Sequence, residues 1–156
     1  MTGWAYRTPK YPMWPGAANT STPPNAYNPP IETEIITKLG VRSMITAPSR
    51  CTSTPNRTVT VEGRAWSGSG DVLRVELSYD AGISWQDVAM LSTPVNKWAW
   101  QKWSGVITLP TQGAFRIMSR ATDVEGRVQP IIAPNWNPKG YMNNAVMNVD
   151  VTITVE

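Results

Sequence analysis

The sequence predicts an all-β domain that follows an extended, proline-rich N-terminal arm, with the boundary between residues 40 and 41. Three observations lead to this prediction. After position 41, apolar and polar residues alternate along several short stretches, and Gly, Pro, Asn and Asp interrupt these stretches every 8–12 residues or so. Before position 41, prolines are frequent and aliphatic residues are scarce. A run with the periodicity of a long helix is missing from the sequence.

Residues 1–40 make up the predicted arm. Prolines recur in TPKYPMWPG, TSTPPN and YNPP, and each proline fixes φ and removes a backbone donor, so this segment is expected to be extended. Five large aromatic residues accompany the prolines: Trp4, Tyr6, Tyr11, Trp14 and Tyr27. Because the arm has no core of its own, the aromatics predict that it packs against the following domain or a partner. A floppy linker with incidental aromatics is the alternative.

Residues 41–156 make up the predicted domain. Along 57–66, Val59, Val61, Gly63 and Ala65 share one face, and polar residues share the other. The same alternation places Leu73, Val75, Leu77 and Tyr79 on one face of 73–79, and Asp80-Ala81-Gly82 then supplies a hairpin turn into 83–88. Later strands are expected at 98–103, 106–109, 115–121 and 149–155. The result is an immunoglobulin-like β-sandwich of about seven strands without that fold's cysteine pair.

Tryptophan is the main source of large apolar side chains in this domain. Five of them, Trp66, Trp85, Trp98, Trp100 and Trp103, are expected to supply core area. In KWAWQKW, alternation puts Trp98 and Trp100 on one strand face and Trp103 on the other, so one set is expected in the core and the other against a second surface. Stacking of these rings on a sugar is the rival explanation.

Composition excludes several classes of function. The net charge of +3 is small and evenly spread, so nucleic acid is not an expected partner. No stretch approaches the ~20 apolar residues of a membrane span, and MTGWAYRTPKYP lacks the apolar run of a signal peptide, so the chain as given is expected to be soluble and without an export signal. With no histidine and one cysteine, Cys51, neither an intrachain disulfide nor the usual zinc, copper or non-haem iron ligand set can be assembled.

Three short motifs look chemical and are interpreted as structural. Asp123 and Glu125 lie in DVEG, which is typical of a solvated turn between strands. Cys51 has Arg50 beside it but no histidine to act as a base, so catalysis by this thiol is not expected. The SGSG run at 67–70 lacks the helix and lysine of a phosphate-binding loop and is expected to join two strands.

Three segments of residues 41–156 together resemble a known family. They are VEGRAWSGSGDVLRVELSYDAGISWQDVAML, KWAWQKWSGVITLP, and RATDVEGRVQP followed by WNPKGYMNNAVMNVDVTI. Their order and spacing resemble the C-terminal dimerisation domain of the sulfite oxidase family of molybdenum enzymes, which includes sulfite dehydrogenases, sulfane dehydrogenases and assimilatory nitrate reductases. The WN-x-x-G-x-x-NN run is the most specific part. The arm then resembles the tail of the catalytic domain plus the linker that follows it.

The resemblance implies roles for particular residues. In this family the WN-x-x-G motif carries a basic residue that reaches the oxyanion pocket of the catalytic domain, and here that residue is Lys139; a solvated loop lysine is the alternative. Asn137, Asn143 and Asn144 are expected to cap turns and pair backbone groups. The candidate interface residues are Trp98, Trp100, Trp103, Trp136 and Tyr141.

The resemblance also implies cofactor, partners and location. Molybdenum-molybdopterin belongs to the associated catalytic domain, and no cofactor is expected on this chain alone; Cys51 does not match the position of the molybdenum ligand. The expected partners are a second copy, the catalytic domain and a cytochrome c electron acceptor. Bacterial relatives are often periplasmic, and a periplasmic location is expected here by resemblance.

The leading hypothesis is a homodimeric, non-catalytic module of a molybdenum oxidoreductase that acts on a sulfur oxyanion, in which one sheet face and the tryptophan-rich strand meet a symmetry mate. The alternative is a free-standing β-sandwich that binds carbohydrate or protein through exposed tryptophans. An oxidoreductase active in its own right is a third possibility, which 156 residues without a cofactor domain disfavour.

Overall fold

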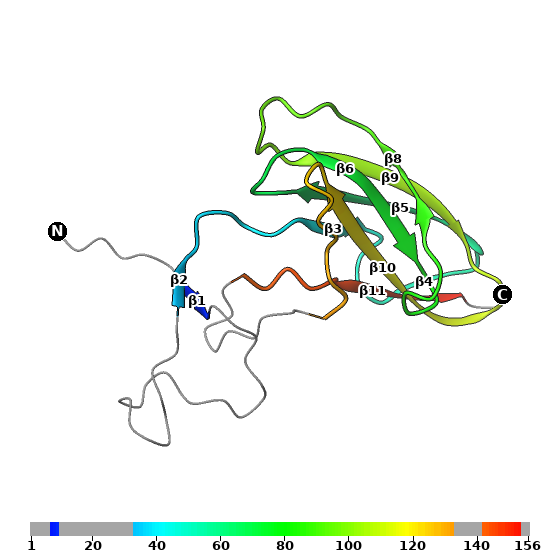
Figure 1. Cartoon of the computed structure of the whole chain (residues 1–156). Coiled ribbons are helices and arrows are strands. Elements are labelled where there is room, and N and C mark those ends of the chain that lie inside the picture. The colour runs from blue at the N-terminus through cyan, green and yellow to red at the C-terminus, as the bar shows by residue number, and fades with distance from the viewer. Residues whose placement is uncertain (1–6, 10–32, 133–141, 154–156) are drawn as a thin grey trace, which may run out of the picture.

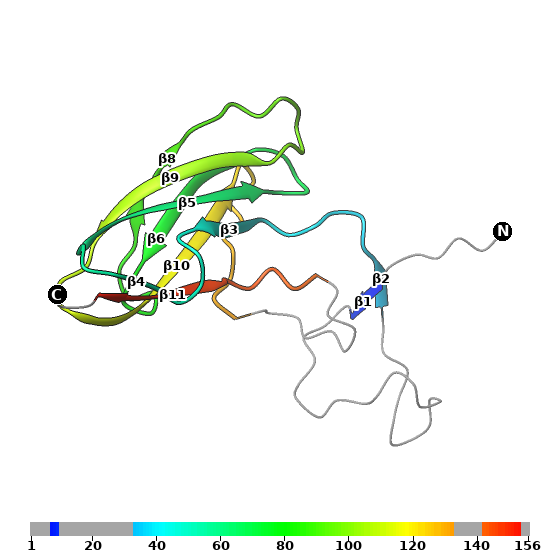
Figure 2. The same ribbon diagram turned by 180° about the vertical axis from the view of Figure 1, so that it is seen from behind.

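A computed structural model describes residues 7–9, 33–132 and 142–153, and all regular secondary structure in these residues is β-strand. Two facing sheets form a sandwich (Figures 1 and 2), which confirms the predicted all-β sandwich. One sheet has the order β3-β5-β9-β8 and the other β4-β11-β10-β6-β7. Two strands of the arm, β1 (Arg7–Pro9) and β2 (Thr33–Ile35), pair with each other in a separate antiparallel ribbon.

The four-stranded sheet consists of β3 (Arg42–Ala47), β5 (Thr58–Trp66), β8 (Ala89–Met90) and β9 (Gln101–Thr108), paired antiparallel. The five-stranded sheet consists of β4 (Thr52–Thr54), β6 (Val72–Ser78), β7 (Gln86–Asp87), β10 (Gly113–Asp123) and β11 (Asn148–Ile153). Its only parallel pair is β11 with β4, counted over the described residues. The β6–β7 hairpin through Asp80-Ala81-Gly82 is confirmed.

The core lies between the sheets and is made by inward-facing aliphatic residues around one indole. In β5, Val59, Val61 and Ala65 are buried and the polar residues between them face outward, as predicted. Gly63 shares the inner face, where an added Cβ would collide with the Trp103 ring and the Met44 carbonyl, so only glycine fits there. The buried core is completed by Val41, Val72, Val75, Leu77, Ile107, Leu109, Ile117, Ala121, Val149 and Val151.

Two sequence-based expectations about the core are wrong. Alternation predicts that Leu73 faces inward, but its side chain is 63% exposed. The reason is a bulge in the pairing of β10 with β6, which passes from Thr122↔Arg74 directly to Asp123↔Val72. This bulge turns Val72 inward in place of Leu73. Composition predicts that the five tryptophans share the core, but Trp103 alone among them is buried. In place of two separate strands at 98–103 and 106–109, β9 starts at Gln101 and runs unbroken to Thr108.

No helix in the described ranges is long and apolar enough to cross a membrane.

Candidate functional site

A cluster of aromatic rings occupies one end of the four-stranded sheet. The rings of Trp66 and Trp100 stack with centroids 4.4 Å apart and planes 13° from parallel. Trp100 is 53% exposed and Trp98, two residues earlier, is 64% exposed. Trp103 has no exposed surface, which removes it from the candidate interface; as an inward residue of β9 it packs under Gly63. The core half of the prediction for KWAWQKW is therefore confirmed at Trp103, whereas Trp98 and Trp100 are exposed and their contact with a second surface stays a prediction.

The exposed tryptophans lie among cations. Arg64 pairs in register with Lys102, and Lys97 Nζ lies 5.8 Å from the centre of the Trp98 ring. Arg42 pairs in register with Trp66. We call this region the tryptophan end: Trp66, Trp98 and Trp100 with Arg42, Arg64, Lys97 and Lys102. Within the part of the chain that the structure describes, no carboxylate forms an ion pair with any of these four cations.

The tryptophan end adjoins the point where the chain enters the sandwich. A cleft of about 270 Å³ is lined by Trp66 and Arg42 together with Leu39, Gly40, Met142, Asn143 and Asn144. Asn144 Nδ2 donates to the Val41 carbonyl (3.1 Å), and Arg42 Nη1 donates to the Asn143 carbonyl (2.8 Å). The segments before β3 and before β11 thus lie side by side, on the side of the molecule away from the C-terminus (Figure 1). Asn143 and Asn144 make turn and backbone hydrogen bonds, as expected.

A buried glutamine ties these segments to the core. Gln129 Oε1 accepts from the Ser43 backbone N–H (2.7 Å) and the Ala121 backbone N–H (3.3 Å). Its Nε2 donates to the carbonyls of Ser43 and Ala145, both at 3.4 Å. Since Ser43 lies in β3 and Ala121 in β10, one side chain joins both sheets and the segment before β11. Sequence analysis missed Gln129, because nothing in its local pattern marks a buried amide.

Lys139, Trp136, Tyr141 and Asn137 lie outside the described residues. The described chain ends at Ile132 before them and resumes at Met142 after them. Both flanks are anchored, since Val146 N–H donates to the Pro130 carbonyl (2.9 Å) and Asn144 binds Val41.

The turn that follows β10 is built on a buried carboxylate, which corrects the expectation of a solvated turn. Asp123 has no exposed surface, and its Oδ2 accepts from Arg127 Nη2 (2.7 Å) and Ser67 Oγ (2.8 Å). Its Oδ1 accepts from the backbone N–H groups of Glu125 and Arg127. Burial alone would raise the pKa of Asp123, but the hydrogen bonds from Arg127 and Ser67 outweigh burial and lower it. The carboxylate stays ionised as a structural anchor, with no geometry for acid–base chemistry.

The β6–β7 hairpin turn is closed by a second aspartate. Ser84 donates to Asp80 through its hydroxyl (2.6 Å) and its backbone N–H (2.9 Å), and Ser78 Oγ donates at 2.7 Å. These hydrogen bonds, with the Ser84 hydroxyl contributing most, lower the pKa of Asp80 from 3.8 to about 2. Asp80 therefore fixes the position of Ile83 at the tip of the hairpin.

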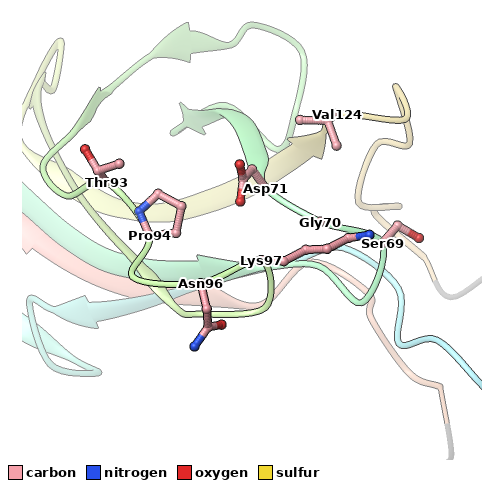
Figure 3. A pocket seen from close by; sticks show the side chains of 8 residues that line it. All are labelled: Ser69, Gly70, Asp71, Thr93, Pro94, Asn96, Lys97 and Val124. Atoms are coloured by element: carbon pink, nitrogen blue, oxygen red, sulfur yellow. The ribbon is translucent and has the colours of Figure 1, made fainter.

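The SGSG run joins β5 to β6 as a loop, as predicted from its sequence. It borders an open hollow of about 540 Å³ (Figure 3), which is also lined by Asp71, Thr93, Asn96, Lys97 and Val124. The Lys97 stem lies across Gly70, and Asp71 on the same wall opposes anion binding. This hollow therefore lacks the features of a phosphate cradle.

The outer face of the five-stranded sheet carries a second cluster, which sequence analysis did not find. Arg120 donates to Glu76 through Nε (2.8 Å) and Nη2 (3.0 Å), a bidentate pair. The Trp85 ring covers the guanidinium at 4.1 Å. Glu76 is only 7% exposed although it faces outward. Arg120 and Glu76 are 44 residues apart in the sequence and face each other on neighbouring strands. This cluster can therefore be predicted only when the register of the two strands is known.

The residues described do not fit a molybdenum centre. Cys51 is an exposed, free thiol, and no group of three or more Cys, Asp or Glu side chains with metal-binding spacing occurs in the described ranges. No step through such a centre is therefore derived for the described residues.

Comparison with known proteins agrees with this geometry. Residues 33–154 match the family model of the Mo-co oxidoreductase dimerisation domain. The chain is 36% identical over 124 residues to mitochondrial sulfite oxidase of Rattus norvegicus, covering 76% of this chain and 23% of that protein. It is also 36% identical over 135 residues to nitrate reductase [NADH] 1 of Phaseolus vulgaris, covering 76% of this chain and 15% of that protein.

A solved structure shares the fold. The sulfane dehydrogenase SoxCD from Paracoccus pantotrophus superposes with a TM-score of 0.64 at 27% identity, covering 74% of this chain and 31% of that chain. The chain belongs to the Mo-co oxidoreductase dimerisation domain family, within the sulfite oxidase family of molybdopterin oxidoreductases. It spans less than a third of the length of each of these three relatives.

Proposed function

We propose that this chain is the homodimerisation module of a molybdopterin-dependent oxidoreductase that acts on a sulfur oxyanion, and that it supplies assembly without catalysing turnover. The match to the dimerisation-domain family over residues 33–154 is the observation that carries the proposal. Sulfite oxidase and a sulfane dehydrogenase among its relatives support a sulfur substrate.

Nitrate is the second candidate substrate, because the identity to a plant nitrate reductase equals that to the rat sulfite oxidase. The test uses the intact gene product, read upstream of the Met1 codon and purified with its catalytic domain. Molybdenum content with sulfite- or sulfane-dependent electron transfer, for example to a cytochrome c, is the expected result. Nitrate reduction without oxidation of a sulfur substrate would overturn the sulfur assignment, and an upstream sequence without a catalytic domain would overturn the oxidoreductase assignment.

The tryptophan end is proposed as the surface that meets the catalytic domain. It adjoins Leu39 and Val41, where residues 1–40 lead into the sandwich, and this arm is proposed as the connection to that domain. Its cations have no acidic partner among the described residues, so an acidic surface is the complementary one. This assigns Trp98 and Trp100 to a contact within the enzyme subunit; Trp136 and Tyr141 stay interface candidates.

Lys139 is proposed to contribute a positive charge to the oxyanion pocket of the catalytic domain. The support is the anchoring of the segment that follows the loop, where Asn143 and Asn144 bind Arg42 and Val41 beside the tryptophan end, the side proposed to face that domain. In the assembled enzyme, Lys139→Met is expected to raise KM for the oxyanion about tenfold or more, while Lys139→Arg restores most of the affinity. An unchanged KM in Lys139→Met would remove this role.

Carbohydrate binding is the second candidate function, and the exposure of the Trp98 ring is the observation that favours it. Glycan-array binding that is lost in Trp98→Ala and kept in Val106→Ala, an exposed aliphatic residue of the same sheet, would support it. Absence of glycan binding by the unmodified chain is the result that our proposal predicts.

A further inference from the structure

The two outer faces of the sandwich differ in how they could meet a second copy of the chain. In a two-fold contact the same patch of each subunit meets itself, so a patch with one sign of charge brings like charges together. The tryptophan end presents Arg42, Arg64, Lys97 and Lys102 without a paired carboxylate in the described ranges. A two-fold contact at the tryptophan end would bury these unpaired cations against the same cations of the second copy, which is unfavourable.

Three arginines on the outer face of the five-stranded sheet are ion-paired. Arg74 and Arg120 both pair with Glu76, at 3.7 and 2.8 Å, and Arg116 pairs with Asp150 at 3.1 Å. Because each of these arginines lies beside a carboxylate on the same face, with Glu76 shared by Arg74 and Arg120, a rotated copy meets charges of both signs instead of a single sign.

Exposed apolar side chains lie beside this ion-paired face. Ile83 at the hairpin tip is 87% exposed, Ile132 is 81% exposed and Ile131 is 46% exposed. Ile131 and Trp85 both lie against Gly82, where a Cβ would be 3.0 Å from Ile131 Cδ1 and 3.2 Å from Trp85 Cζ2. We call this the isoleucine patch: Ile83, Trp85, Ile131 and Ile132. It includes residues from two parts of the chain, which meet where Ile131 and Trp85 lie against Gly82.

The residues beneath the isoleucine patch are already ordered. Arg120 is held by two hydrogen bonds to Glu76 and covered by Trp85, and Asp80 fixes the hairpin that carries Ile83. Docking on such a surface costs little side-chain entropy. Tryptophan and arginine, here Trp85 and Arg120 in contact with each other, are also the residue types enriched in interface hot spots.

We infer that a second copy of this chain docks on the isoleucine patch and the adjoining outer face of the five-stranded sheet, and that the tryptophan end stays clear of the two-fold axis. The inference rests on the proposed homodimer and names the surface that forms it. It departs from the expectation that the tryptophan-rich strand meets the symmetry mate.

Sedimentation equilibrium of the full chain tests this inference, under reducing conditions because Cys51 is exposed and free. Three variants are compared with the unmodified chain: Ile83→Glu on the isoleucine patch, Val95→Glu as a control of matched exposure (91%) elsewhere, and the double variant Trp98→Ala/Trp100→Ala. Ile83→Glu is expected to raise the dimer Kd about tenfold or more, and the other two to change it less than about twofold. Circular dichroism verifies that each variant is folded.

The outcomes separate the inference from the function on which it rests. A dimer that survives Ile83→Glu, or one that is lost in Trp98→Ala/Trp100→Ala, overturns the docking surface and leaves the homodimer standing. An unmodified chain that stays monomeric at the highest concentration overturns the homodimer itself.

Discussion

The tryptophan end and the isoleucine patch are both rich in exposed apolar side chains, yet their charges differ. At the tryptophan end, Arg42 pairs in register with Trp66 and Lys97 lies near the Trp98 ring, and no ion pair of the described residues involves the cations of this end. At the isoleucine patch, Arg120 is paired with Glu76 and covered by Trp85. Exposed apolar area indicates that a surface binds a partner. The charge pattern indicates whether that partner is a second copy of the chain or a different, acidic surface.

The largest expected effect separates buried from exposed tryptophan. Trp103→Ala should lower the free energy of unfolding by about 3–5 kcal/mol, because it empties the centre of the core. Trp98→Ala should change it by less than about 1 kcal/mol, since that ring is 64% exposed. Urea unfolding of both variants measures the difference, and similar losses would show that the tryptophan end belongs to the core and is not a free surface.

The paired cluster beneath the isoleucine patch gives the next effect. Glu76→Gln should cost about 1–3 kcal/mol, because it leaves the partly buried Arg120 without its carboxylate. The matched control is Glu62→Gln on the outer face of the other sheet, where the side chain is exposed and the loss should stay within about 0.5 kcal/mol. Thermal unfolding compares the two, and an equal effect would mean that the Arg120 pair adds no order to the patch.

Some of this contrast was predictable from sequence and some was not. Period-two alternation was enough to assign the faces of β5, because the register shift in its pairing with β3 places the extra residue in β3, between Ile45 and Ala47. It failed at Leu73, where the bulge between β10 and β6 shifts the register, a consequence of pairing between distant strands. Alternation correctly separated Trp98 and Trp100 from Trp103. It could not predict which of the two sides is buried, because that depends on the position of the facing sheet.

The polar contacts were harder to predict, because they join residues far apart in sequence. Asp123 lies in a typical turn motif, and its burial depends on Ser67 from another loop. Gln129 and the Arg120–Glu76–Trp85 cluster likewise depend on partners from other strands. The family resemblance supplied Lys139, which local physical chemistry would leave as an ordinary loop lysine.

A smaller effect concerns the hairpin that holds Ile83. The pKa of Asp80 is about 2 in the folded chain and 3.8 in its ordinary state, so the folded state favours the carboxylate. The resulting stability is fully present above pH 3.8 and is lost as pH falls toward 2. Asp80→Asn should therefore flatten the fall of Tm between these pH values, while Asp87→Asn, an exposed residue of the same hairpin, should not. An unchanged profile in Asp80→Asn would show that its hydrogen bonds do not stabilise the turn.

The smallest expected effect is on self-association through the tryptophan end. Lys97→Gln/Lys102→Gln should leave the dimer Kd within about twofold, since neither lysine lies at the inferred two-fold contact. Analytical ultracentrifugation at low salt measures it. A dimer that tightens markedly on loss of these charges would place the tryptophan end at the axis.

The most direct test of the account is sedimentation equilibrium of the unmodified chain at about 0.05 M and about 0.5 M salt, between which the range of exposed electrostatic interactions shortens severalfold. The account predicts a dimer at both salt concentrations with similar Kd, because an apolar patch beside cations that are already ion-paired depends little on screening. A monomer at both would contradict the dimerisation function. A dimer that forms only at high salt would show that cations face each other across the axis, as they would at the tryptophan end.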